Sequence, residues 1–210
     1  MIEITDKSQC CGCTACASVC PKMCIAMKED EEGFLYPEAD ASLCIGCGLC
    51  EKVCPVLHQG DARKPLAVYA AKNRDENVRM ASSSGGIFSL LAERVIDDGG
   101  VGFGARFDDN WEVIHDFAET KEKLVAFRGS KYVQSCMESC FVQAKRFLDG
   151  GRKVLFTGTS CQIAGLKNYL RKDYENLLAV DVVCHGVPSP EAWRKYVKEI
   201  SASQGGENLK

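Results

Sequence analysis

The sequence lacks three features that would assign it to common classes. No apolar run approaches the roughly 18 residues of a membrane-spanning helix, and the start, MIEITDKSQ, has neither the basic nor the apolar region of an export signal. The formal net charge of -3 gives no reason to expect nucleic acid or an anionic membrane as a partner. These absences predict a globular, cytoplasmic protein with no membrane span.

Cysteine, by contrast, is abundant, with 14 copies in 210 residues. Eight of them form two runs with the spacing C-x2-C-x2-C-x3-C, each followed by proline, which is the bacterial ferredoxin pattern. The runs are Cys10, Cys13, Cys16 and Cys20 before Pro21, and Cys44, Cys47, Cys50 and Cys54 before Pro55. In this pattern the fourth cysteine of each run binds the other cluster.

The spacing therefore predicts two 4Fe–4S clusters with exchanged fourth ligands. Cluster one is predicted to take Cys10, Cys13, Cys16 and Cys54, and cluster two to take Cys44, Cys47, Cys50 and Cys20. Cys11 and Cys24 fall outside the register and are expected to be packing residues. Gly12, Gly46 and Gly48 would let the backbone approach the clusters.

Zinc and disulfides are the alternative uses of so many cysteines. Zinc sites typically use separated C-x2-C pairs, whereas this chain has triplets with a distant fourth cysteine. Disulfides require an oxidising compartment, and no export signal is visible. Two full copies of the run favour iron–sulfur clusters over both.

The composition divides the chain into a ferredoxin-type head and an α/β domain. Residues 1–57 form the cysteine-rich head, with a hairpin expected over residues 25–36. Residues 58–65 are polar, contain His58 and end in proline, so they are predicted to be a linker. Residues 66–210 are predicted to form the α/β domain, which this chain leaves incomplete at its C-terminal end.

The first half of this domain mixes strands and helices. Residues 66–73 are expected to form a strand, and a helix with an apolar stripe at Ile87, Leu90, Leu91 and Val95 follows Gly85-Gly86. Two strands are expected around residues 108–110, with His115 on the surface. A further helix is expected to carry Cys136 and Cys140 on one face, where both serve packing.

The last third predicts a βαβ unit. RKVLFTG and NLLAVDVVCHG are predicted to be buried parallel strands joined by the helix TSCQIAGLKNYLRK. A final helix should begin after Ser189 with Pro190 in its first turn. The overall expectation is an α+β ferredoxin-like head followed by an α/β domain.

The segment SSSGGIF is the clearest phosphate-binding candidate. Ser83, Ser84, Gly85 and Gly86 precede a predicted helix, whose N-terminal N–H groups and dipole favour a phosphate. An ordinary capped helix explains the same residues, with the serines at positions 82–84 as N-caps. The G-x-G-x-x-G fingerprint is absent, since GVGFGARF follows a helix rather than a strand.

Several strings together resemble the coenzyme F-420 hydrogenase/dehydrogenase beta-subunit family. They are GF-YPE, SSSGGIF, RGSKYVQS, VLFTGTSCQIAGL and DVVCHGVPSP, in order and at sensible spacing between Cys10 and Trp193. The resemblance implies FAD, iron–sulfur clusters and electron transfer with an organic acceptor, a deazaflavin coenzyme in methanogens. It also implies that a C-terminal part is missing here. Ser160 departs from the family, which usually has proline there.

The resemblance extends the set of candidate site residues. Lys131 is expected to be a counter-charge for the flavin phosphates, and Tyr132 to pack near the flavin ring. Cys161 and Cys184 each follow a strand of the βαβ unit, at the edge where α/β sheets bind ligands. They are expected to be half the ligands of a third 4Fe–4S cluster, with sulfurs about 6–7 Å apart. A buried strand residue and a helix-start thiol are the alternative roles.

Two functions follow from these residues. The first is an iron–sulfur flavoprotein oxidoreductase that passes electrons between the clusters, a flavin and an organic substrate. The second is a ferredoxin-type relay subunit that docks a partner enzyme without a flavin of its own. The expected partners are a ferredoxin or a hydrogenase or dehydrogenase subunit.

Overall fold

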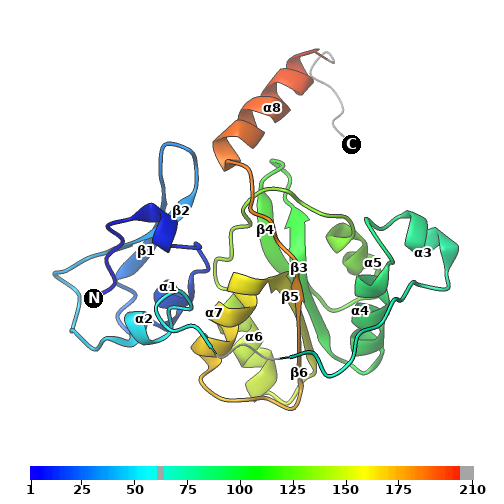
Figure 1. The fold of residues 1–210 in the computed structure, drawn as a ribbon, viewed down its shortest axis with the longest axis horizontal. Helices are drawn as coiled ribbons and strands as arrows, with labels where there is room; N and C mark the ends of the chain where they lie inside the picture. The colour runs from blue at the N-terminus through cyan, green and yellow to red at the C-terminus, as the bar shows by residue number, and fades with distance from the viewer. Residues whose placement is uncertain (61–63, 204–210) are drawn as a thin grey trace.

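The computed structural model describes residues 1–60 and 64–203. The predicted linker at 58–65 includes residues 61–63, which lie outside the described part. Figure 1 shows the head beside a larger domain built on a sheet. Among the described residues, no helix combines the length and the apolar composition needed to cross a membrane.

The head contains one hairpin and short helices. Strands β1 and β2 pair antiparallel with Ile25 opposite Ala39, and Gly33 N donates to Asp30 O in the turn between them. The elements are η1 (Lys7–Gln9), α1 (Ala15–Val19), β1 (Ile25–Glu29), β2 (Leu35–Ala39) and α2 (Leu49–Lys52). The hairpin prediction is confirmed, and the two cysteine runs lie in the loops and short helices beside it.

The larger domain is built on a four-stranded sheet of order β4-β3-β5-β6. Strands β3, β5 and β6 are parallel, and β6 lies at one edge of the sheet. Strand β4 lies at the other edge and pairs antiparallel with β3. The strands are β3 (Val101–Phe107), β4 (Val113–Ala118), β5 (Val154–Thr159) and β6 (Leu177–Val182). The helices are α3 (Glu76–Met80), α4 (Ile87–Asp97), α5 (Lys121–Leu124), η2 (Val125–Phe127), α6 (Cys140–Asp149), α7 (Ser160–Leu170) and α8 (Pro190–Ser203).

Helices cover both faces of the sheet, and β5 shows the consequence for its side chains. Val154 and Phe156 belong to the hydrophobic cluster under α6 and α7, whereas Leu155 belongs to the cluster under α4 and α5. All three side chains are buried, as expected for a parallel strand covered on both faces. The βαβ prediction from β5 through α7 to β6 is confirmed.

The glycines of GVGFGARF have a packing role in β3. A Cβ at Gly102 would lie 3.2 Å from Leu124, and one at Gly104 would lie 3.2 Å from the Phe127 ring. The absent side chains therefore let α5 and η2 lie directly on the sheet.

The head and the sheet domain share one hydrophobic cluster. Cys13 and Ala15 of the head pack with Phe141, Ile163 and other buried side chains of α6 and α7. One close approach is at Gly165, where an added Cβ would lie 3.0 Å from the Cys13 sulfur. The head is therefore fixed against the α6–α7 face of the sheet domain (Figure 1).

Residues 66–73 do not form the predicted strand. Leu66, Val68 and Tyr69 are almost fully exposed, and the segment pairs with no strand of either described sheet. Its one backbone bond to a distant loop runs from Asn73 N to Gly85 O, at 2.7 Å. High β-propensity was insufficient here because a strand also needs a paired edge and a buried face.

Strand β6 was predicted to be buried, but it lies at the edge of the sheet. Leu178 and Val182 are exposed by 43% and 56%. The apolar run correctly predicted a strand. Burial of β6 would require a further element beyond it, and no described residue forms a strand on that side of β6.

Two helix-face predictions need correction. Leu90 of α4 is exposed, because the buried face of that helix is centred on Ser89, Ala92 and Val95. Cys136 and Cys140 do not share a helical face, because α6 begins only at Cys140 and Cys136 lies before it, bridged to Ile114. Cys140 is buried in the core, as expected for packing.

His115 was expected on the surface, but its side chain is only 5% exposed. Its Nε2 lies 2.7 Å from the Thr157 carbonyl oxygen, and its Nδ1 lies 3.3 Å from the Ser135 hydroxyl. Because the carbonyl can only accept, Nε2 carries the proton and Nδ1 accepts from Ser135. Burial lowers the pKa of His115 to about 4.

The buried His115 predicts a loss of stability in acid. Its pKa is lowered on folding, so between about pH 6.5 and 4 the unfolded chain binds a proton that the folded chain excludes. Stability should therefore fall by on the order of 3 kcal/mol as the pH drops through this window. Urea unfolding of parent and His115→Asn chains at pH 7 and 5 should show a shallower pH dependence in the variant. Exposed His58→Asn should keep the parent slope; an equal slope in all three chains would contradict the assignment.

The close contacts at Gly165 predict that a larger side chain there would lower the stability of the protein. A valine side chain in place of Gly165 would overlap the Cys13 sulfur and the Phe141 ring, which lie 3.0 and 3.4 Å from the Cβ position. Gly165→Val should lower the free energy of unfolding by about 1–3 kcal/mol. Lys167→Val, at an exposed site of the same helix, matches the change to a β-branched residue without the clash. Equal stability of the two variants would show that the close contact does not matter.

Candidate functional site

The first cysteine set surrounds one hollow in the head. Cys10, Cys13, Cys16 and Cys54 line it, so the predicted ligands of cluster one are brought together. The Thr14 hydroxyl lines the same hollow and is buried without a hydrogen-bond partner in the described part of the chain. An orphaned donor and four thiols are a suitable lining for an iron–sulfur cluster, whose sulfides accept hydrogen bonds.

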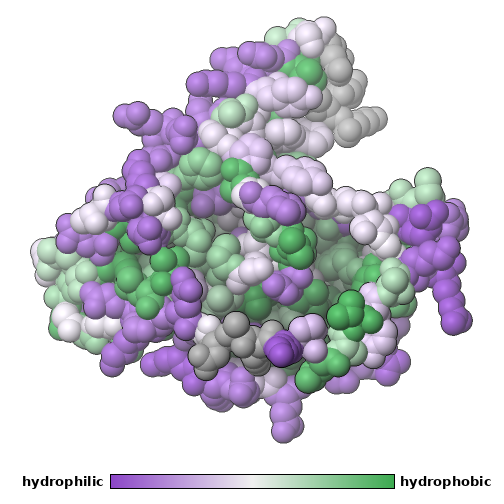
Figure 2. All heavy atoms as spheres, in the orientation of Figure 1, coloured by the Kyte–Doolittle hydropathy of each residue, from purple (hydrophilic) through white to green (hydrophobic). Residues whose placement is uncertain are grey.

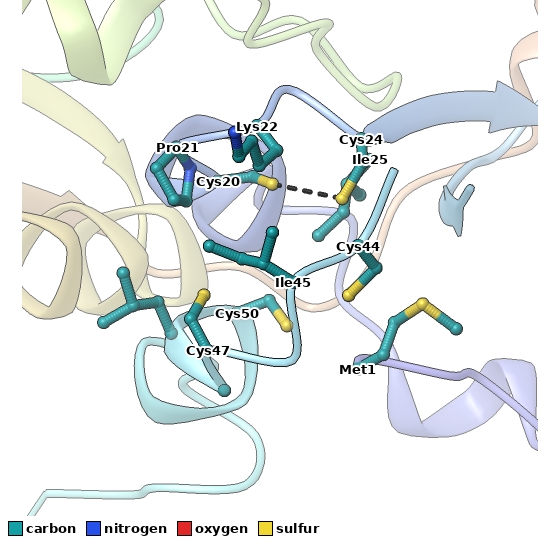
Figure 3. Close-up of a pocket in the computed structure, with 12 residues that line it drawn as sticks. Met1, Cys20, Pro21, Lys22, Cys24, Ile25, Cys44, Ile45, Cys47 and Cys50 are labelled. Atoms are coloured by element: carbon teal, nitrogen blue, oxygen red, sulfur yellow. Dashed lines mark hydrogen bonds between the residues drawn. The ribbon is translucent and has the colours of Figure 1, made fainter. Parts of the chain in front are cut away.

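The second set lines a separate hollow. Cys20, Cys44, Cys47 and Cys50 line it, so the predicted ligands of cluster two also lie together (Figure 3). Cys47 is exposed, and Ile45, which lines the same hollow, is exposed by 60%. Figure 2 shows hydrophobic spheres among hydrophilic ones on the visible face of the head.

Backbone groups support the predicted ligands. Gly12 N donates to the Cys10 sulfur at 3.5 Å, and Ile2 N donates to the Cys50 sulfur at 3.3 Å. Gly12 has a φ of +63°, and a Cβ there would lie 2.4 Å from the Gln134 side-chain nitrogen. Glycine is therefore required at this position both by the backbone and by the contact with the sheet domain.

Burial favours the protonated form of two thiols in the first hollow. It raises the pKa of Cys16 to about 12 and also raises that of Cys10. Because metal ligands must be thiolates, binding iron in these hollows would release protons and replace buried neutral groups with a compensated charge. The residues present fit two 4Fe–4S clusters in number, type and position.

The two cysteines outside the register also lie in the head's packed parts. Cys24 is buried, and its sulfur lies 3.3 Å from that of Cys20. Cys11 packs against the cluster that joins the head to α7. The interaction of Cys11 with Cys13 raises the pKa of Cys11 to about 12, while its contact with Cys161 acts in the opposite direction.

The proposed phosphate loop and the RGSKYVQS segment come together in space. Ser130 N donates to the Ser83 hydroxyl at 2.7 Å, across 47 positions of sequence. Gly86, with a φ of +71°, is the residue before α4, so the serines do not cap the helix as predicted. Ser82 instead donates to Val78 O at 2.7 Å. Ser84 remains exposed at the start of the helix.

Lys131 and Tyr132 differ in their surroundings. The Lys131 ammonium donates to the carbonyl oxygens of Ala126, Arg128 and Gly129 at 3.0, 2.8 and 3.1 Å. Burial lowers the pKa of this ammonium to about 8. Lys131 therefore holds its own loop closed, and Tyr132 is 73% exposed beside it.

Cys161 and Cys184 lie past the same ends of adjacent parallel strands. Thr159 pairs with Val182 in the β5–β6 register, Cys161 is in the first turn of α7, and Cys184 is two residues beyond β6. The Cys161 sulfur lies 3.1 Å from the Thr159 hydroxyl, whereas Cys184 is exposed and accepts from Gly186 N. The 6–7 Å separation of the two sulfurs stays a prediction. His185 beside Cys184 is exposed.

Ser160 does not disturb the start of α7. Its hydroxyl donates to the Asp181 carboxylate at 2.8 Å, which ties the helix to β6. Gln162 Oε1 accepts from Thr159 N at 2.9 Å, in a capping box. The turn that carries Cys161 is therefore well supported without proline.

A buried polar chain behind this turn was missed in the sequence. Gln162 Nε2 donates to the Ser135 hydroxyl at 2.8 Å, and Ser135 donates in turn to His115. Its neighbour Gln134 accepts from Leu35 N at 2.9 Å and so joins the sheet domain to the head. The alternation of β4 could have revealed His115, because it shares the inward-facing parity of Val113.

Comparison with known proteins gives three matching family models. Residues 9–57 match a 4Fe-4S dicluster domain. Residues 68–141 and 151–207 match the coenzyme F420 hydrogenase/dehydrogenase beta subunit, N-terminal and C-terminal models, which together span more than half of the chain. The chain belongs to this beta-subunit family. The resemblance seen in its sequence strings is confirmed, and the dicluster match supports iron–sulfur clusters in the head.

Among solved structures, the chain is similar to one in the F420-reducing [NiFe] hydrogenase complex from Methanosarcina barkeri. The two are 21% identical with a TM-score of 0.49, and the match covers 66% of this chain and 49% of that one. The match therefore spans about half the length of that chain. No curated protein matches.

The cysteine assignments predict distinct outcomes for single variants. Anaerobically prepared protein should contain about eight iron and eight sulfide per chain. Cys13→Ala should lose about half of each, whereas Cys11→Ala, at a matched position two residues away, should keep both clusters. Iron and sulfide analysis with EPR of the reduced protein measures this. Stoichiometric zinc without visible absorbance, or cluster loss in Cys11→Ala, would contradict the assignment.

Proposed function

We propose that this chain is an iron–sulfur flavoprotein that carries electrons between two 4Fe–4S clusters in residues 1–57 and a flavin in the α/β domain, residues 66–210. Clusters supply one-electron transfer and a flavin couples it to two-electron chemistry on an organic substrate. The organic substrate is a deazaflavin coenzyme or another large acceptor, and the protein partner is a ferredoxin or a hydrogenase or dehydrogenase subunit.

The observation that carries this proposal is the contact between the two parts. Cys13, a proposed cluster ligand, packs against α7, the helix that begins at the carboxyl edge of the parallel sheet. That edge is where open α/β sheets bind their ligands. The chain thus joins a cluster-binding loop to a ligand-binding edge through one rigid helix.

The contact between Ser83 and the loop at Ser130 favours a phosphate site at the start of α4. Gly86 leaves the first N–H groups of α4 without a side-chain cap, and Ser84 is exposed beside them. Ser83 holds this turn to the loop at Ser130. Ser83, Ser84, Gly85 and Gly86 are therefore proposed to hold the flavin phosphates. Lys131 shapes the loop and adds positive charge, and Tyr132 is available to cover the ring.

Cys161 and Cys184 are proposed as two ligands of a third 4Fe–4S cluster. Their support is the β5–β6 register, which places both residues at one edge of the sheet. Ligands from outside residues 1–210 would have to complete such a site.

A relay subunit without flavin is the second candidate. The observation that favours it is Lys131, because all three donors of its ammonium are engaged by backbone carbonyls. A counter-charge for a bound phosphate would ordinarily be freer. Flavin retention therefore distinguishes the two functions.

Ser84 provides the sharpest test of the flavin site. Ser84→Asp puts a negative charge at the N-terminus of α4, where it suits the helix but repels a phosphate. Flavin binding should weaken by roughly tenfold or more, whereas Ser84→Asn, which matches aspartate in size without its charge, should weaken binding clearly less. The measurement is fluorescence of FAD or FMN released after anaerobic reconstitution. A full-length parent protein that retains no flavin would instead support the relay function.

A further inference from the structure

Cys24 lies at the wall of the second hollow although the ferredoxin register leaves it out. Its sulfur is 3.3 Å from that of Cys20, the contact drawn as a dashed line in Figure 3. It lines the same hollow as Cys44, Cys47 and Cys50 and is only 6% exposed. The contact therefore brings an unassigned thiol to a proposed ligand of cluster two.

The backbone is shaped to make this contact. Met23 N donates to Cys20 O at 3.1 Å, which closes a turn, and Met23 has a φ of +49°. A residue with a Cβ rarely adopts this left-handed backbone conformation. Asp40 N then donates to Cys24 O at 2.8 Å and fixes Cys24 at the start of the hairpin. An unfavourable turn is thus held in place, and it directs Cys24 inward rather than toward solvent.

The chemistry of the pair becomes directional when Cys20 binds iron. A ligating cysteine is a thiolate with no hydrogen, so only the Cys24 thiol can donate between these two sulfurs. Free cysteine is a weak S–H donor, and hydrogen bonds to ligand sulfurs are among the features that set cluster potentials. Such a bond strengthens as negative charge on the ligand sulfur increases, so it favours the reduced state.

The two cysteine runs differ at this position. Cys24 is four residues after Cys20, and His58 is four residues after Cys54, the matching ligand in the other run. His58 is exposed, whereas Cys24 is buried. The first hollow also has an extra thiol, Cys11, but it has none at this place after its fourth cysteine.

We propose that Cys24 is a positioning and tuning residue for cluster two, whose S–H group donates to the Cys20 ligand sulfur and raises the reduction potential of that cluster. Reduction adds one electron and transfers no proton in this scheme. The inference rests on the part of the proposed function that makes Cys20 a cluster ligand. It does not depend on the flavin.

The test compares the whole chain with four variants under anaerobic conditions. Cys24→Ala removes the donor, Cys24→Ser keeps one, and His58→Ala changes the equivalent position of the other run. Cys47→Ala removes a proposed ligand of cluster two, so the EPR signal of cluster two should disappear in this variant. The midpoint potential that is lost with it belongs to cluster two. The readout is an EPR-monitored redox titration, with iron and sulfide content measured on every sample.

The expected result is a selective shift. Cys24→Ala should lower only the cluster-two midpoint, with a change of up to about tenfold in the reduction equilibrium, which is 59 mV for one electron. Cys24→Ser should keep most of the parent value, and His58→Ala should leave both midpoints unchanged.

Three results would overturn the inference. An unchanged cluster-two midpoint in Cys24→Ala would show that the thiol does not act on Cys20. Loss of half the iron and sulfide in both Cys24 variants would make Cys24 a ligand rather than a donor. A parent chain without iron would remove the basis of both this inference and the proposed function. Absence of flavin alone would leave the midpoints measurable, so the two failures are distinguishable.

Discussion

The contact between Cys13 and Gly165 determines how the two parts of this protein can cooperate. An added Cβ at Gly165 would lie 3.0 Å from the Cys13 sulfur, so the ligand loop lies directly against α7. Glycine in a helix interior costs about 1 kcal/mol relative to alanine, and here it permits this approach. Because Cys13 is a proposed cluster ligand, its position and that of α7 are set by the same contact.

Helix α7 carries this constraint to the edge of the sheet. Its first turn holds Cys161, and behind that turn Gln162 connects through Ser135 to the buried imidazole of His115. Each of these polar groups has a partner, which is the condition under which a buried network adds rigidity rather than cost. The turn that carries Cys161 is thus supported both by the head and by the interior of the sheet domain.

The sequence predicted elements well where the evidence was local, and poorly where burial depended on distant neighbours. Cysteine spacing grouped the residues that line each hollow, and strand-helix-strand order identified the βαβ unit. The exposed segment 66–73 and edge strand β6 were misjudged because the same apolar residues suit a buried or an exposed strand. His115 was misjudged although the alternation of β4 marks it as inward-facing, and its partners Ser135 and Thr157 lie 20 and 42 positions away. The spacing of cysteines along the sequence gives no indication of the contact between Cys11 and Cys161.

The two cysteine runs have the same spacing but different surroundings. The first hollow is closed by Cys13 against α7 and holds the buried Thr14 hydroxyl. The second hollow is lined by exposed Cys47 and by Ile45, whose side chain is also exposed. Low-dielectric burial and solvent exposure stabilise charge differently, so identical ligand sets in these two places need not have equal potentials. A duplicated motif thereby becomes two inequivalent sites, one in contact with α7 and one with the exposed Cys47 in its lining.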